Sequence, residues 1–169
     1  MKKLILSINI VLIFIFWAIS LNAKTFVVAE SIEPSTFDPI KSSGLGWHSQ
    51  VWSTVLETLA WTDPSGNVHP RLATSWSTSS DGLVWNFKLR KNVRFHNNEV
   101  FTADDVVYSF ERAMSDGIPM VKQRYKNVKS LSAVNDHSVK INLKNKDNLF
   151  INTVGDPTGI AFSILNRKD

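Results

Sequence analysis

The sequence contains no cysteine, so disulfide bonds cannot stabilise its fold and a cysteine nucleophile is excluded. A bacterial lipoprotein needs a cysteine directly after its cleavage site to carry the lipid, and that residue is also missing. If the chain is exported, we therefore expect a product that is not lipid-anchored.

A strong charge imbalance is also absent. The formal net charge is +4, and two of the positive charges, Lys2 and Lys3, lie at the extreme N-terminus. No run of basic residues has the length typical of a nucleic-acid-binding patch. We therefore expect a surface of mixed charge and no nucleic-acid partner.

The residue patterns of common enzymes are missing as well. The sequence has no GxSxG motif, and Asp104 and Asp105, being consecutive, cannot face one substrate as an acid/base pair if they lie on a helix. The histidines are His48, His69, His96 and His137. None of them forms an HxxxH or HExxH pair, which predicts no metal site. We expect a protein that is not an enzyme and needs no cofactor.

Residues 1–23 have the organisation of a secretory signal peptide. Lys2 and Lys3 precede an apolar run over residues 4–21, and the small residue Ala23 offers a cleavage point. The alternative is an uncleaved membrane anchor, since the run is near the lower length limit for crossing a bilayer. Cleavage is the preferred interpretation, and with it a periplasmic location.

The most regular stretch covers residues 81–114. Its first part alternates large apolar residues with polar ones, which predicts a strand with one buried face. The apolar members are Leu83, Trp85, Phe87 and Leu89. Together with a strand expected at residues 72–77 and the connection at residues 79–82, this strand should form a hairpin.

A helix should follow from Thr102. The spacing of Thr102 and Asp105 is that of a capping box, and Gly117 and Pro119 end the apolar periodicity. The expected apolar stripe consists of Val106, Val107, Phe110, Ala113 and Met114. We therefore predict that one side of this helix is buried.

Other elements are predicted with the same reasoning. A strand is expected at residues 25–29, a helix at 47–61, a turn at 63–66, a hairpin with arms 128–134 and 138–144, and a short helix at 148–154. The small-residue loop 42–46 precedes the first helix. It lacks the Lys-Ser/Thr ending of a P-loop and the GxGxxG of a dinucleotide site, so phosphate binding is not expected.

Several of these segments, in this order and spacing, resemble the family 5 bacterial extracellular solute-binding proteins. The matching stretches are LATSW at residues 72–76, the DG turn at 81–82, FKLRKNVRFH at 87–96 and FTADDVVYSFER at 101–112. Asn92 and Asn97-Asn98 stand where the family usually has Gly or Asp-Gly. Apart from glycine, asparagine is the residue that best tolerates a left-handed backbone, so we expect both turns to form.

The resemblance implies the peptide- and dipeptide-binding component of an ABC importer, whose partners are a membrane permease and an ATPase. It implies a mixed α/β fold: a type II periplasmic-binding-protein lobe, incomplete here, with an inserted domain of hairpins and a helix. On this mapping, residues 1–23 are the signal peptide, 24–58 the first leg of lobe I, 59–165 the inserted domain, and 166–169 a truncated end without the second lobe. A monomer is expected.

The resemblance also implies ligand contacts at the loop before the first helix. Ser43, Gly44 and Leu45, and next to them Trp47, are the expected ligand-binding residues, whereas His96 is expected to have a structural role. A loop that merely begins a helix is an alternative that stays open. Two other functions also stay open: a secreted carbohydrate-binding module, and an exported fragment without transport activity.

Overall fold

The computed structural model describes residues 27, 36–41, 48–156 and 162–168. The chain divides into two compact units, residues 1–31 and residues 32–169, and all helices and strands described below belong to the second. The predicted signal peptide lies outside the described residues, as does the strand expected at 25–29 except for Val27. Among the helices described, none is long and apolar enough to cross a membrane.

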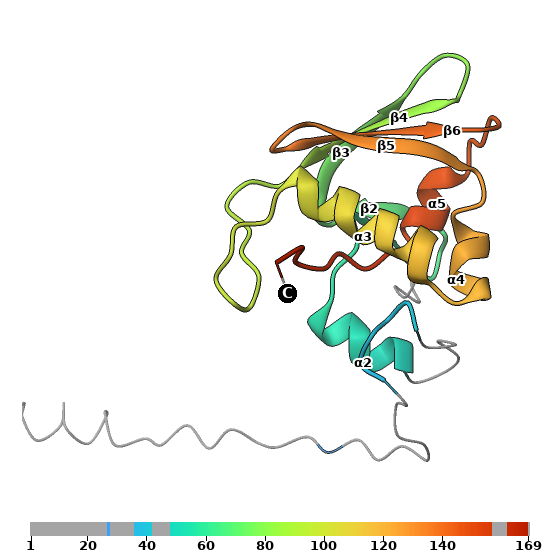
Figure 1. The fold of residues 1–169 in the computed structure, drawn as a ribbon. Helices are drawn as coiled ribbons and strands as arrows, with labels where there is room; N and C mark the ends of the chain where they lie inside the picture. The colour runs from blue at the N-terminus through green and yellow to red at the C-terminus, as the bar shows by residue number, and fades with distance from the viewer. Residues whose placement is uncertain (1–26, 28–35, 42–47, 157–161, 169) are drawn as a thin grey trace, which may run out of the picture. The chain divides into compact units, whose positions relative to one another are not determined.

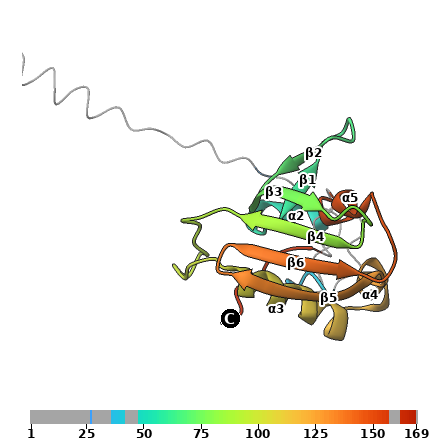
Figure 2. The same ribbon diagram turned by 90° about the horizontal axis from the view of Figure 1, so that it is seen from above.

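A four-stranded antiparallel sheet is the centre of the fold, with strand order β3-β4-β6-β5. The strands are β3 (Ala73–Thr78), β4 (Val84–Leu89), β5 (Val128–Asn135) and β6 (Ser138–Leu143). The predicted hairpins β3–β4 and β5–β6 are both confirmed. The two hairpins join where β4 pairs with β6, as Figure 2 shows.

One side of this sheet is buried, as the period-two pattern predicted. In β4, Trp85, Phe87 and Leu89 are buried whereas Asn86 and Lys88 are exposed. Strand β6 repeats the pattern, so the apolar side chains of both central strands point the same way. The helices α3 and α5 lie on that side of the sheet (Figure 1), and α3 contacts both β5 and β6.

Helix α3 (Ala103–Asp116) begins and ends where the sequence indicates. Thr102 and Asp105 form the predicted capping box, in which the Thr102 backbone N–H donates to the Asp105 carboxylate at 2.8 Å. Val106, Phe110 and Ala113 of the expected stripe are fully buried. Two further helices follow along the chain, α4 (Pro119–Arg124), which the sequence left unassigned, and α5 (Phe150–Val154), which it predicted.

The first helix is shorter than predicted. Helix α2 (His48–Val55) ends six residues before the predicted end at residue 61, and Ala60–Thr62 is strand β1, paired with β2 (Val68–Pro70). The predicted helix end at residue 61 was wrong because tertiary contacts take over the backbone here. The Leu59 carbonyl accepts hydrogen bonds from the N–H groups of Arg71 at 3.1 Å and Ala73 at 2.8 Å. The Leu59 side chain is fully buried in the core.

The predicted turns are present. In the turn between β1 and β2, the Gly66 N–H donates to the Asp63 carbonyl at 2.9 Å, and Gly66 has a φ of 87°. Asn92 and Asn98 adopt φ values of 61° and 74°, the left-handed region. Asparagine therefore replaces glycine at both positions while keeping its backbone conformation.

The last described segment, residues 162–168, runs across α3. Leu165 donates its backbone N–H to the Ser109 hydroxyl at 2.8 Å, and Ile164 donates to the Glu57 carbonyl at 2.9 Å. Phe162 stacks on Tyr125 with ring centroids 4.5 Å apart. This segment therefore connects α3, the loop after α2 and the aromatic core.

Candidate functional site

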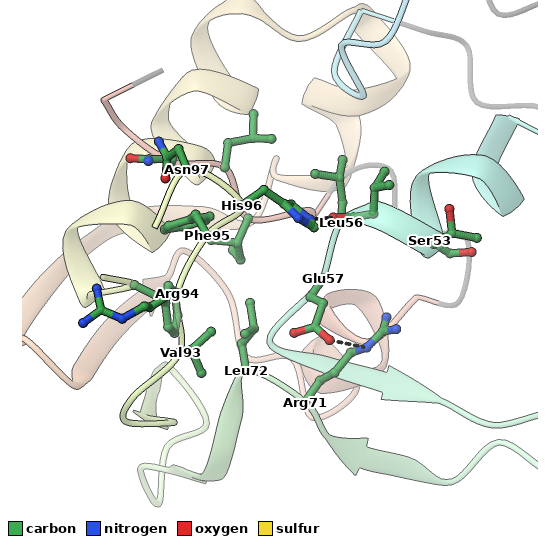
Figure 3. Close-up of a pocket in the computed structure, with 16 residues that line it drawn as sticks. Ser53, Leu56, Glu57, Arg71, Leu72, Val93, Arg94, Phe95, His96 and Asn97 are labelled. Carbon is green, nitrogen blue, oxygen red and sulfur yellow. Dashed lines mark hydrogen bonds and ion pairs between the residues drawn. The ribbon is translucent and has the colours of Figure 1, made fainter. Parts of the chain in front are cut away.

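A cleft with a volume of about 540 Å³ lies among the described residues. Five segments that are far apart in the sequence meet at it: residues 53–57, 71–72, 93–97, 101 and 164–166. Figure 3 shows the loop 93–97 on one side and Glu57 with Arg71 on the other. The cleft lies where the segment before β1, the connection between β2 and β3, and the loop after β4 meet residues 164–166.

The walls of the cleft carry both charges. Glu57 and Arg71 form an ion pair, with Oε1 and Nε 3.9 Å apart, at the rim (Figure 3). Arg94 Nη1 donates to the Asn98 carbonyl at 2.7 Å, and His96 Nε2 lies 3.4 Å from the Val55 carbonyl oxygen. Each of these contacts restricts the orientation of a polar side chain in the wall of the cleft.

The floor of the cleft is apolar. Leu72 and Phe101 are almost fully buried, and Phe95 packs edge-on against Phe101 with ring centroids 6.1 Å apart. Val55 remains 53% exposed. An apolar floor with a few oriented polar groups at the rim is the usual composition of a small-molecule site, so this cleft can bind a ligand by contact and hydrogen bonding.

A second hollow of about 340 Å³ lies next to the first, and Arg71 lines both. Its other lining residues are Ser53, Leu56, Thr58, Trp61, Asp156 and Ser163. Asp156 is held by an ion pair with Arg124 of α4. No cluster of three or more potential metal ligands occurs among the described residues.

Hydrogen bonds and ion pairs shift the pKa values of Asp38, Asp63 and Arg112. The pKa of Asp38 is lowered, first by its hydrogen bonds to the Arg112 guanidinium, which approaches at 3.0 and 2.5 Å. The same pair raises the pKa of Arg112. Asp63, whose carboxylate accepts hydrogen bonds from His69 and Asn67, also has a lowered pKa. These carboxylates are therefore held in their charged form.

The predicted ligand-binding residues Ser43, Gly44, Leu45 and Trp47 lie outside the described residues. On one side of them, Ile40 is buried and its carbonyl accepts from the Ile118 N–H at 3.0 Å. The residues lining the cleft were not found from the sequence, because nothing in a local pattern shows that residues 57, 71 and 96 approach one another. The sequence analysis singled out His96, but predicted a structural role for it.

Comparison with known proteins identifies the family. Residues 67–168 match the model of bacterial extracellular solute-binding proteins, family 5 Middle, and the chain belongs to this family. Solute-binding proteins are not enzymes, which confirms that interpretation of the sequence. The family resemblance read from the LATSW to FTADDVVYSFER segments is thereby confirmed as well.

Among its relatives is the di/tripeptide-binding protein 2 of Pseudomonas aeruginosa, 30% identical over 165 residues, which cover 86% of this chain and 31% of the relative. The heme-binding protein A of Haemophilus influenzae is 31% identical over 155 residues, which cover 80% of this chain and 28% of that protein. The chain thus spans about a third of the length of these relatives.

Solved structures agree with this assignment. The oligopeptide-binding protein AppA of Bacillus subtilis, solved with a nonapeptide, has a TM-score of 0.70 and 28% identity and covers 80% of this chain and 26% of its own. The murein tripeptide binding protein MppA of Escherichia coli has a TM-score of 0.70 and 26% identity, and the match covers 80% of this chain and 29% of MppA. The fold is therefore a mixed α/β type II periplasmic-binding-protein lobe, matched over part of its neighbours' length.

Proposed function

We propose that this chain is part of the substrate-binding component of an ABC importer that takes up di- or oligopeptides. The observation that carries the proposal is the family match over residues 67–168 together with relatives named for binding di- and tripeptides or oligopeptides. The binding component itself does no chemistry. It captures the peptide in the periplasm and delivers it to a membrane permease driven by an ATPase.

The proposed layout keeps the boundaries that the resemblance implies. Residues 1–23 direct export, residues 24–58 begin the first lobe, residues 59–165 form the inserted domain, and residues 166–169 lead out of it. The sheet, α3 and α5 all fall within 59–165, and the ion pair of Asp38 with Arg112 connects the first lobe to that domain. The ligand is enclosed when this lobe closes on a second one by hinge motion.

The proposed peptide contacts are Ser43, Gly44, Leu45 and Trp47. A loop of small residues at a helix start can approach the main chain of a peptide closely and donate backbone N–H groups to it. Recognition of the shared main chain allows peptides of different sequence to bind. The protein acts as a monomer in the periplasm.

Export and binding are tested on the protein purified from the periplasmic fraction. N-terminal sequencing should start near residue 24, and retention in the membrane fraction would contradict the signal-peptide assignment. Binding is measured by isothermal titration with a dipeptide, a tripeptide and a pentapeptide on the product of the complete gene. The absence of heat for all three peptides would contradict peptide binding.

Haem is the second candidate ligand, because the heme-binding protein A relative is as similar as the peptide-binding ones. The same protein should therefore be titrated with haem and followed by its absorbance. Saturable haem binding that a tripeptide does not displace would favour the haem function over the peptide function. Displacement by a tripeptide at equimolar concentration would place both ligands in one site.

A further inference from the structure

The four-stranded sheet has an outer face, on the side away from α3 and α5, and among the described residues no helix or strand covers it (Figures 1 and 2). Because side chains alternate along a strand, this face carries the residues that lie between the buried ones of β4 and β6. Cross-strand pairing extends the outer face to the edge strands β3 and β5. All four strands therefore contribute to one open surface.

The outer face is made mostly of short, uncharged polar side chains. The strands β3 to β6 contain no aspartate or glutamate, and their aromatic residues belong to the buried side of the sheet. Short side chains leave the longer lysines of this face accessible to a large partner. The serines and asparagines of the outer face are Ser75, Ser77, Ser130, Ser132, Asn86 and Asn142.

Lys88 of β4 and Lys140 of β6 give the outer face its positive charge. Lys88 is paired with Ser138, two residues before Lys140 on β6, so the two lysines are diagonal neighbours. Neither lysine belongs to an ion pair of the described residues, and the carboxylates of the adjoining turns, Asp81 and Asp136, do not pair with them. Two like charges without a counter-charge attract an anionic partner.

The positive charge continues to the margins of the sheet. Lys129 is exposed at the irregularity of the edge strand β5. Arg90 and Lys144 directly follow β4 and β6, and they donate to the backbone carbonyls of Arg71 at 3.1 Å and Lys126 at 2.8 Å. These acceptors are neutral, so both side chains keep their full positive charge.

We propose that the outer face of the sheet binds an anionic phospholipid surface. A sheet face can bring several cations against a bilayer at once, and each lysine or arginine near anionic headgroups raises the binding constant about fivefold. Serine and asparagine side chains can donate hydrogen bonds to the phosphate oxygens. A polynucleotide is disfavoured, because the face offers no aromatic ring on which bases can stack. This binding is separate from peptide capture and does not depend on it.

Co-sedimentation of the exported protein with lipid vesicles tests the proposal. Vesicles of equal parts phosphatidylglycerol and phosphatidylcholine should bind the protein at about 50 mM salt and release most of it at about 300 mM, since salt screens the attraction. Vesicles of phosphatidylcholine alone should not bind it. The double variant Lys88→Gln, Lys140→Gln removes both charges of the outer face and should lower the partition coefficient at least about tenfold.

The matched control is Lys122→Gln, Lys126→Gln, which removes two exposed lysines at the end of α4, on the helix side of the sheet (Figure 1). It makes the same change in net charge and should stay within about twofold of the wild type, because these charges do not face the lipid. Thermal melting shows that both double variants are folded. The proposal is overturned if the wild type does not bind the anionic vesicles, if it binds an oligonucleotide in their place, or if the two double variants lose binding equally.

Discussion

The carboxylate of Asp105 accepts a hydrogen bond from the backbone N–H of Arg167, 62 positions further along the chain, with 3.2 Å between Oδ1 and N. The other oxygen, Oδ2, accepts from the Thr102 N–H at the start of α3. Asp105 is only 3% exposed. One buried carboxylate therefore both caps the helix and holds residues 162–168 against its first turn.

Replacing Asp105 by alanine should destabilise the fold markedly. The variant loses the helix cap and leaves the N–H groups of Thr102 and Arg167 without this acceptor, so the free energy of unfolding should fall by about 2 kcal/mol. Urea denaturation followed by circular dichroism measures it. The control is Asp104→Ala, whose side chain is 54% exposed and pairs with the Arg167 side chain; this change should cost less than about 1 kcal/mol. Equal losses for the two variants would contradict the structural role of Asp105.

Phe162 should be essential for the aromatic core. It is 1% exposed and contacts both Tyr125 and Phe110, the latter with ring centroids 5.3 Å apart. Phe162→Ala leaves a cavity between them and should lower the free energy of unfolding by about 3–5 kcal/mol, as in other large-to-small core changes. Leu149→Ala is the control, since Leu149 is 70% exposed, and it should change stability by less than about 0.5 kcal/mol. A Phe162→Ala protein as stable as the control would show that residues 162–168 do not pack as described.

The Asp38–Arg112 ion pair should make stability depend on pH. The folded-state pKa of Asp38 lies below its ordinary value, chiefly because of the Arg112 hydrogen bonds. The contribution of the ion pair to the free energy of unfolding is therefore fully present above the pKa of Asp38 in the unfolded chain, about 4. It is lost as the pH falls through the lower pKa of Asp38 in the folded protein. The difference in unfolding free energy between wild type and Asp38→Asn should be largest near neutral pH and shrink toward about pH 2. Urea unfolding at several pH values measures it, and a difference independent of pH would contradict the ion pair.

The left-handed turn at Asn92 should accept glycine but no β-branched residue. Asn92 has a φ of 61°, a conformation that glycine adopts without cost. Asn92→Gly should therefore leave the melting temperature within a degree or two, whereas Asn92→Val should lower the free energy of unfolding by about 1–2 kcal/mol. Thermal denaturation of both variants checks this. An Asn92→Val protein as stable as Asn92→Gly would mean that residue 92 has a negative φ.

The sequence predicted those elements whose signals are local. The alternation of Trp85, Phe87 and Leu89 and the Thr102–Asp105 capping box act within one strand or one helix turn, and both are found as expected. The predicted end of the first helix was wrong because the Leu59 carbonyl accepts hydrogen bonds from Arg71 and Ala73, which lie beyond the β1–β2 hairpin. No propensity within residues 47–61 contains that information.

The cleft was less accessible to prediction than the fold. At the rim of the cleft, Glu57 pairs with Arg71, and the loop 93–97 brings His96 close to the Val55 carbonyl. Both contacts depend on how separate hairpins pack, which a local sequence pattern does not show. Sequence reasoning instead placed the ligand contacts by resemblance at Ser43, Gly44, Leu45 and Trp47, which stay a prediction. The stacked Trp61–His69 pair was also missed, because Trp61 was assigned to the end of a helix and residues 67–71 were assigned to no element.

The central claim, that the protein serves peptide import, is tested most directly by uptake of radiolabelled di- and tripeptides into cells. A strain with the gene deleted should import at least one of these peptides more slowly than its parent, and a plasmid copy of the intact gene should restore the rate. The copy with Gly44→Trp, which places a bulky side chain at the proposed peptide contact, should not restore it, although the protein is still exported. Uptake of every peptide at the parental rate in the deletion strain would contradict the peptide-import function.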